Sequence, residues 1–149
     1  MTRDLPTSLL MFIASRAASE RIFRAVQEAG FTDLTLAQGR LMMGMEPDGS
    51  RLSTLADRGQ IAKQTATALV DKLERAGYVE RVPDPSDGRA RLVRFTSRAL
   101  AVLPIARAEE ARIEAEWRAH LGAERMDQLR DALTALREVT DPHRPPHQA

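Results

Sequence analysis

Residues 69–96 read LVDKLERAGYVERVPDPSDGRARLVRFT, and they join an amphipathic helix to a basic β-hairpin. The helix is predicted over residues 62–76, because Leu69, Val70 and Leu73 recur at the spacing that gathers side chains on one helical face. The opposite face of this helix carries polar and small residues. One face is therefore predicted to pack against a core, while the other stays free to contact a partner.

The hairpin follows directly after the helix. Gly77 is predicted to end the helix as its C′ residue, since glycine adopts the left-handed conformation that this position requires. Alternating apolar residues predict short strands over 78–82 and 91–95. The run PDPSDG at 83–88 between them is rich in turn-forming residues and predicts a loop.

Helices are predicted on both sides of this unit. Apolar residues at helical spacing predict helices over 5–28, 35–45 and 97–140. Gly122 is predicted to break the last of these into two helices. Ser53 is predicted to cap a short additional helix, which then ends in a turn over 57–60. The fold class is therefore mostly α, with a single small hairpin.

Composition limits the classes of protein that the chain can represent. Its 149 residues, 43% hydrophobic and 29% charged, suit one compact domain with extensions. The absence of cysteine excludes disulfides, thiolate nucleophiles and cysteine-based zinc sites. No apolar run predicts a membrane span or an export signal, so a cytoplasmic location is expected. No phosphate-binding loop, nucleophile motif or metal-ligand cluster is present, so the sequence predicts neither an enzyme, a cofactor nor a metal site.

The net charge of +1 conceals an uneven distribution along the chain. Between Arg51 and Arg98 there are ten Lys and Arg against six Asp and Glu, and the rest of the chain has twelve against fifteen. The positive charge is therefore local. A basic region on an otherwise acidic body is typical of a nucleic-acid-binding face.

Three segments resemble the MarR family of winged helix-turn-helix transcription regulators. They are LSTLA at 52–56, LVDKLERAGYVER at 69–81 and DPSDGRARLVRFT at 84–96. The most specific mark is the Asp-x-Arg of Asp87 and Arg89, at its distance after a Leu-Glu-x-x-Gly segment. The sequence departs from the family pattern at Ala68, where many relatives carry an arginine on the recognition helix, and at Ala99, a position often occupied by glycine.

The resemblance implies a set of DNA contacts. The first turns of a recognition helix enter the major groove, which makes Lys63, Gln64, Thr65 and Thr67 the candidates there. Gln64 is expected to read a base, because its amide can pair bidentately with adenine. The resemblance places Arg89 in the minor groove, where negative potential attracts a guanidinium, with Asp87 orienting it through a carboxylate–guanidinium pair. Ser53, Arg81 and Arg91 are expected to contact phosphates.

The outer helices imply a homodimer on a pseudo-palindromic operator in double-stranded DNA. Their apolar stripes exceed what the central domain needs, and two half-sites one helical turn apart, about 34 Å, require two joined domains. The expected organisation comprises an N-terminal dimerisation helix at 1–30, the winged helix-turn-helix domain at 31–98, C-terminal dimerisation helices at 99–140 and a disordered tail at 141–149. A monomeric helical cap is the alternative.

The resemblance also implies a repressor that a small aromatic or lipophilic acid releases from DNA. The expected ligand-binding residues are Phe12, Arg16, Met42, Met43 and Trp117, with Arg16 meeting a carboxylate. A cluster of Met and aromatic residues at helical spacing is equally typical of a packed core. A second function stays open, that of a helical protein-interaction module that has lost DNA binding, and Ala68 is the residue that supports it. The operator, the target genes, the direction of regulation and the ligand are not determined by the sequence.

Overall fold

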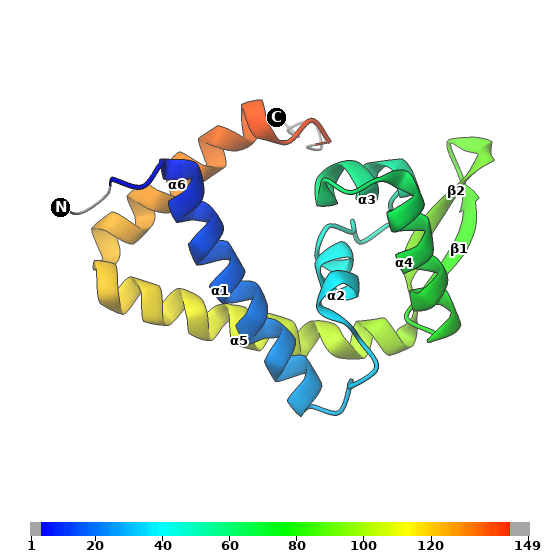
Figure 1. Ribbon diagram of the computed structural model, residues 1–149, viewed down its shortest axis with the longest axis horizontal. Coiled ribbons are helices and arrows are strands. Elements are labelled where there is room, and N and C mark those ends of the chain that lie inside the picture. Colours follow the sequence, from blue (N-terminus) through cyan, green and yellow to red (C-terminus); the bar gives the residue numbers. More distant parts are fainter. Residues whose placement is uncertain (1–3, 144–149) are drawn as a thin grey trace.

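A computed structural model describes residues 4–143 as six helices and one hairpin (Figure 1). The elements are α1 (Thr7–Glu28), α2 (Leu36–Met43), α3 (Leu52–Gly59), α4 (Lys63–Arg75), β1 (Val79–Asp84), β2 (Asp87–Phe95), α5 (Ser97–Leu121) and α6 (Ala123–Thr140). This confirms the predicted mostly α class. Within residues 4–143, no helix is long and apolar enough to cross a membrane.

The elements form two groups joined by α5 (Figure 1). Helices α2, α3 and α4 and the hairpin pack together at one end, where their apolar side chains form the main core. Its fully buried members include Leu55, Val70, Leu73, Tyr78 and Val79. Helix α1 crosses α5, and α6 turns back from the far end of α5. This group is called the central domain below because it is central in the sequence; its core also includes Val26 of α1 and Ala99 and Val102 of α5.

Two glycines end helices as predicted. At the end of α4, Gly77 has φ +82°, and its N–H donates to the carbonyl of Glu74 while the Tyr78 N–H donates to that of Leu73. This pair of bonds is a Schellman motif, and it sends the chain sharply into β1. Gly122, with φ +85°, separates α5 from α6.

Two predictions about helix α3 are wrong. The helix begins at Leu52 with Arg51 as its N-cap residue, so Ser53 lies inside the first turn and does not cap it. The helix also continues through Gly59, and the predicted turn over 57–60 is reduced to Gln60, which adopts a left-handed conformation. An apolar residue at the first helical position starts the helix earlier than the preference for a serine cap suggests.

The hairpin is longer than the sequence predicts. β1 reaches Asp84 and β2 starts at Asp87, so the strands take in most of the predicted loop. The pairing is antiparallel, with an irregularity between Pro83 and Asp84. Ser50 extends the base of the hairpin, because its N–H and carbonyl both bond to Val93, at 2.9 and 2.8 Å.

The end of α6 returns to the central domain. The guanidinium of Arg58 in α3 donates to the carbonyl oxygen of His143 at 2.9 Å, and the His143 ring lies 3.1 Å from the Asp57 carboxylate. Residues 141–143, the first of the predicted tail, therefore contact α3. Residues 144–149 lie outside the described residues.

Candidate nucleic-acid interface

Helix α4 has the two faces that its sequence predicts. Ala66, Val70 and Leu73 are completely buried against the core. Lys63, Gln64 and Thr65 are exposed in the first turn. The partly exposed Thr67 hydroxyl donates to the Lys63 carbonyl at 2.8 Å, and Ala68 is exposed. The outer face of the first two turns thus presents one cation, one amide and two hydroxyls.

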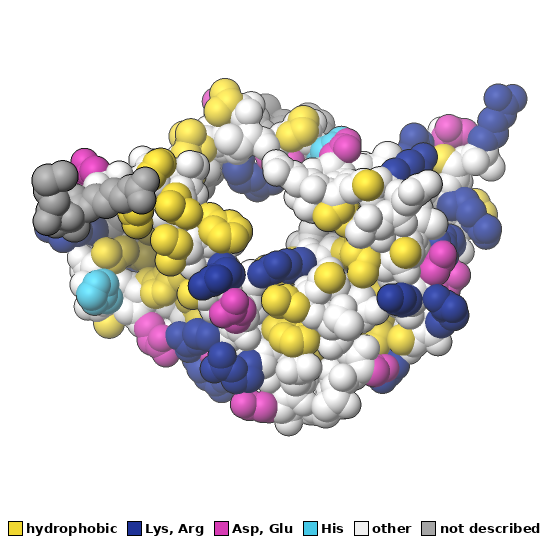
Figure 2. Space-filling model, viewed as in Figure 1, with side chains coloured by type: hydrophobic (Ala, Val, Ile, Leu, Met, Phe, Trp, Pro, Cys, Tyr) yellow, Lys and Arg dark blue, Asp and Glu magenta, His cyan; other side chains and the backbone are white. Residues whose placement is uncertain are grey.

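The hairpin ends in a basic tip. Arg89 and Arg91 are exposed, and within the described residues neither guanidinium has a hydrogen-bond or ion-pair partner. Basic side chains project from the end of the hairpin, beyond the body of the domain (Figure 2). Asp87 accepts a hydrogen bond from the backbone N–H of Arg89 at 3.1 Å. The expected pair between the Asp87 carboxylate and the Arg89 guanidinium is absent, because the carboxylate fixes the backbone and leaves the cation free.

A buried carboxylate lies at the last residue of β1. Asp84 is 7% exposed and accepts from the Ser86 hydroxyl at 2.7 Å, from the Ser86 N–H at 2.9 Å and from Nε of Arg51 at 2.8 Å. The Ser86 bonds, together with Arg51, lower the pKa of Asp84 to about 2. Arg51 also lies 4.0 Å from the Asp87 carboxylate. One guanidinium next to α3 therefore meets both carboxylates at the tip.

The Arg81 side chain forms ion pairs with helix α4. Its guanidinium lies 2.7 Å from Asp71 and 2.8 Å from Glu74, both on α4. These pairs join the middle of β1 to α4. The guanidinium that the sequence predicts to contact a phosphate is thus bound within the protein. The same pairs neutralise two carboxylates on the exposed side of α4.

The ten basic residues between Arg51 and Arg98 divide into paired and unpaired sets. Those that pair with carboxylates are Arg51, Arg58, Arg81, Arg94 and Arg98. Those without an ion pair to any described residue are Lys63, Lys72, Arg75, Arg89 and Arg91. The unpaired set is confined to α4 and the hairpin. The uncompensated positive charge therefore lies on the two elements that the sequence predicts to contact DNA.

A second polar cluster supports the end of α4. The Tyr78 hydroxyl donates to Asp33 at 2.5 Å, and the guanidinium of Arg98 lies 3.0 Å from the same carboxylate and 4.2 Å from the centre of the Tyr78 ring. Burial, followed by the hydrogen bond to Asp33, raises the pKa of Tyr78 to about 12. The cluster joins the α1–α2 loop to the start of β1 and of α5.

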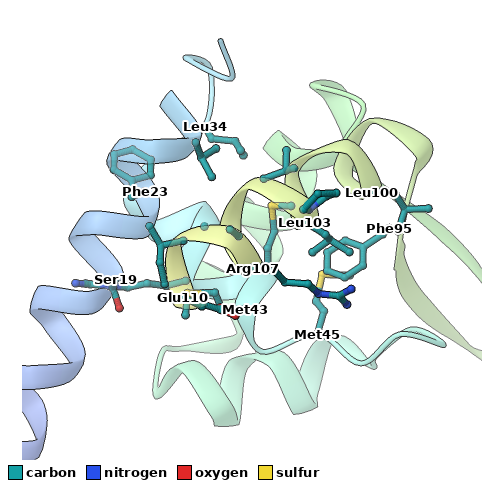
Figure 3. A pocket seen from close by; sticks show the side chains of 18 of the residues that line it. Ser19, Phe23, Leu34, Met43, Met45, Phe95, Leu100, Leu103, Arg107 and Glu110 are labelled. Atoms are coloured by element: carbon teal, nitrogen blue, oxygen red, sulfur yellow. The ribbon is translucent and has the colours of Figure 1, made fainter. Parts of the chain in front are cut away.

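A cavity of about 520 Å³ lies between α1, α2 and α5 (Figure 3). Its apolar lining includes Phe23, Met42, Met43, Met45, Phe95 and Leu103. Arg40, Arg107 and Glu110 also line it, and none of the three pairs with a described residue. Figure 3 shows the Arg107 side chain extending toward the side of Met45 and Phe95, with Glu110 on the side of Ser19.

The cavity differs from the ligand site expected from the sequence. Of the five expected residues, Met42 and Met43 line it, whereas Phe12, Arg16 and Trp117 do not. Arg16 lies 3.7 Å from Glu20 on its own helix. The apolar stripe of α1 indicates which face of the helix is buried, but not where along its length α5 crosses it. Because of where α5 crosses, Phe23 lines the cavity and Phe12 does not.

Sequence reasoning also missed Arg51 and Asp84. The two residues are 33 positions apart, and no local pattern predicts that they meet. A signal was present at Asp84 itself, because an Asp two residues before a serine in a Pro-containing turn is typical of a carboxylate that bonds the backbone of that turn.

Known proteins share parts of this sequence and most of the fold. A profile of the MarR family matches residues 32–90. Over 74 residues the chain is 36% identical to the transcriptional activatory protein BadR of Rhodopseudomonas palustris, a match covering 49% of this chain and 42% of BadR. The chain thus matches less than half the length of this curated relative.

Two solved structures have the same fold at low identity. The crystal structure of MarR is 24% identical, with a TM-score of 0.72 over 93% of this chain and 92% of that one. The structure of NadR in complex with 4-hydroxyphenylacetate is 19% identical, with a TM-score of 0.70 over 93% and 97%. The profile match spans α2, α3, α4, β1 and the first residues of β2, and the shared fold includes the outer helices. Residues 32–90 are therefore similar to the MarR family, and the whole chain shares the fold of solved MarR structures.

Proposed function

We propose that this protein is a homodimeric transcription regulator that binds double-stranded DNA, with α4 in the major groove and the hairpin in the minor groove. The observation that carries the proposal is the distribution of unpaired charge, since Lys63, Arg89 and Arg91 are exposed and free on these two elements while most neighbouring arginines are paired. MarR-family regulators are DNA-binding proteins and not enzymes, in agreement with the lack of a catalytic motif in the sequence. Such a regulator acts in the cytoplasm.

Each contact has a different expected role. Arg89 supplies positive charge to the minor groove, and Arg91, Lys63 and Ser53 face phosphates. Gln64 is the base-reading residue, because its exposed amide can donate and accept at one base edge. Thr65 and Thr67 are neighbouring candidates, and Ala68 adds no polar contact. Arg81 holds the hairpin to α4 and does not contact a phosphate.

Affinity for DNA upstream of the protein's own gene tests these roles. Arg89→Ala is expected to weaken binding about tenfold on all sequences and to reduce the slope of log affinity against log salt by about one. Gln64→Ala is expected to change base preference at one position of each half-site, by about 1–3 kcal/mol. Arg125→Ala is the matched control, because Arg125 is an exposed, unpaired cation on α6. Wild-type affinity in both variants would contradict the proposal and favour an interaction module without DNA binding.

Homodimer formation is supported by an exposed apolar surface on the outer helices. In α1 the run Leu9–Ile13 is exposed on all sides of the helix, with Phe12 60% exposed. Leu129, Leu133, Leu136 and Val139 form an exposed stripe on α6. A helix that is apolar all round is typical of a buried helix, and large exposed apolar patches mark interaction sites. A second copy that interdigitates here would cover both surfaces.

We further propose that a small acid with an apolar body binds the cavity and releases DNA. The cavity volume lies within the range of small-molecule sites, and the unpaired guanidinium groups of Arg40 and Arg107 favour an anion. An acid of this kind, 4-hydroxyphenylacetate, is bound in the NadR structure that shares the fold. Release requires that the ligand prefer a state in which the two α4 helices are wrongly spaced for DNA.

The ligand proposal is tested with 4-hydroxyphenylacetate and other aromatic acids as probes. Arg107→Gln is expected to weaken binding of the acid about tenfold, measured by calorimetry, while DNA affinity without the acid stays unchanged. Arg24→Gln, an exposed cation outside the cavity, is the control. If no aromatic acid binds, or if Arg107→Gln binds each acid as the wild type does, this site assignment fails. A reporter assay then distinguishes repression, which we propose, from the activation named for BadR.

A further inference from the structure

The direction of the hairpin tip is a separate structural question. A two-stranded hairpin has little stability or stiffness of its own, and residues 85–89 of the tip are exposed. Arg89 can reach one groove only if the tip points the right way. Contacts outside the hairpin must therefore fix its direction.

Polar contacts join the hairpin to the rest of the domain at two distances from its base. Ser50 bonds to Val93 near the base. Arg81 pairs with Val93 across the hairpin, so its contacts to Asp71 and Glu74 of α4 lie at the same level. Arg51 binds Asp84 next to the tip. Arg51, which also lies 4.0 Å from Asp87, is the outside residue nearest to Arg89, and its short pair with Asp84 therefore has the most influence on where the tip points.

The Asp84 carboxylate and the Arg51 guanidinium form a fixed contact, called the joint below. One oxygen of its carboxylate closes the turn through both Ser86 bonds, and the other accepts from Arg51, so both oxygens are engaged. The side chain is buried, and its low pKa reflects the hydrogen bonds that favour its charged form. Arg51 precedes α3 directly. The joint therefore transmits the position of α3 to the tip.

We propose that Arg51 and Asp84 are positioning residues for DNA binding, which hold the hairpin tip in the direction that places Arg89 in the minor groove. This inference rests on the proposed function. It gives Asp84, rather than Asp87 alone, the task of aiming Arg89, and it makes α3 the support of the wing as well as of α4.

A double-mutant cycle on DNA affinity tests the coupling. Asp84→Asn is expected to weaken binding about tenfold, and adding Arg89→Ala to it is expected to cost less than about twofold more, because the aimed contact is already lost. Lys63→Ala is expected to cost the same in both backgrounds, since it acts at α4. Asp48→Asn is the matched control, because Asp48 is an exposed carboxylate in a nearby turn. Multiplicative effects of Asp84→Asn and Arg89→Ala, or wild-type affinity in Asp84→Asn, would overturn the proposal.

The identity of the groove gives a second readout that simple destabilisation would not change. Replacing adenine by 2,6-diaminopurine at the wing-contacted positions puts an amino group in the minor groove and leaves the major groove unaltered. Wild-type protein is expected to lose affinity on this DNA, whereas Asp84→Asn and Arg51→Gln are expected to bind both duplexes equally. Retained discrimination in both variants would show that the tip is still aimed without the joint.

A measurement without DNA separates this inference from the proposed function. Amide hydrogen exchange over residues 86–90 is expected to be faster in Asp84→Asn than in the wild type, with α4 unchanged. Ser86→Ala, which removes one hydrogen bond and no charge, serves if Asp84→Asn does not fold, and it should show a smaller increase. Unchanged exchange at the tip refutes the joint even if DNA binding is confirmed. Failure of the wild type to bind DNA, with faster exchange at the tip, refutes the proposed function and with it the groove assignment.

Discussion

Arg81 and Arg89 show how surroundings decide what an arginine does. Both belong to the hairpin and both resemble DNA contacts in the sequence. Arg81 lies against Asp71 and Glu74 and holds β1 to α4, while the guanidinium of Arg89 has no partner within the described residues. A guanidinium that already binds two carboxylates has its charge compensated, so it attracts a phosphate less strongly than a free one does. The free guanidinium is the one available to DNA.

Tyr78 provides a prediction about pH at the scale of one residue. Its phenol has a folded-state pKa of about 12 against an ordinary value of 10.0. The unfolded chain therefore releases this proton first as pH rises, so the stability from the protonated phenol is complete below pH 10 and is lost between about pH 10 and pH 12. Tyr78→Phe is expected to lose about 1 kcal/mol of unfolding free energy at pH 7 and less at alkaline pH.

Denaturant unfolding at neutral and alkaline pH measures this difference. Tyr78 is the only tyrosine in the chain, so phenolate absorbance reports its titration directly. Phe31→Leu, which alters the ring packed 6.4 Å from Tyr78 without removing a polar group, is the control. Parallel pH profiles for the wild type and Tyr78→Phe would show that the hydroxyl does not carry the effect.

At the scale of the elements, the base of the hairpin depends on a glycine. Gly49 has φ +104°, and a Cβ there would lie 3.2 Å from Leu92 Cβ and 3.3 Å from the Val93 carbonyl. Gly49→Ala is therefore expected to cost about 1–3 kcal/mol of unfolding free energy. Gly88→Ala is the matched change at the tip of the same hairpin, where a Cβ has no neighbour within 4 Å. Equal melting temperatures for the two variants would contradict this account.

The sequence predicts elements better than it predicts the contacts between them. Gly77 and Gly122 end their helices where expected, because a left-handed residue is a local requirement. The longer strands were missed because Pro83 suggests a loop, although proline is tolerated in an irregular two-stranded pairing. The Arg51–Asp84 joint and the cavity lining at Phe23 and Arg107 depend on how elements pack, which local patterns do not contain.

At the scale of the whole molecule, the chain nearly closes on itself. Helix α5 leaves the central domain, α6 returns, and residues 141–143 contact α3 through Asp57 and Arg58. Figure 2 shows the hollow that this path surrounds. The apolar runs of α1 and α6 face outward or into this space without a partner from the described chain. They are the surfaces that a second copy is proposed to cover.

Phe12→Glu is therefore expected to dissociate the proposed homodimer. A carboxylate buried in an apolar interface costs several kcal/mol unless it is paired, which outweighs the contribution of most single contacts. Light scattering is expected to give twice the 16.5 kDa chain mass for the wild type and the single mass for the variant. Ala101→Glu, an exposed position on α5 near the central domain, is expected to stay dimeric. A monomeric wild type at micromolar concentration would instead support a helical cap.

The position of Ser50 and Arg51 has a consequence for protein engineering. The first residue extends the base of the hairpin, and the second binds its tip. A chimaera that exchanges α4 alone would keep the original wing direction. One that exchanges the hairpin alone would bring in a foreign tip without the arginine that binds that tip in its own protein. DNA specificity should therefore be transplanted as one continuous cassette from Gly49 to Phe95, with the junctions placed in the turn before α3 and before the start of α5.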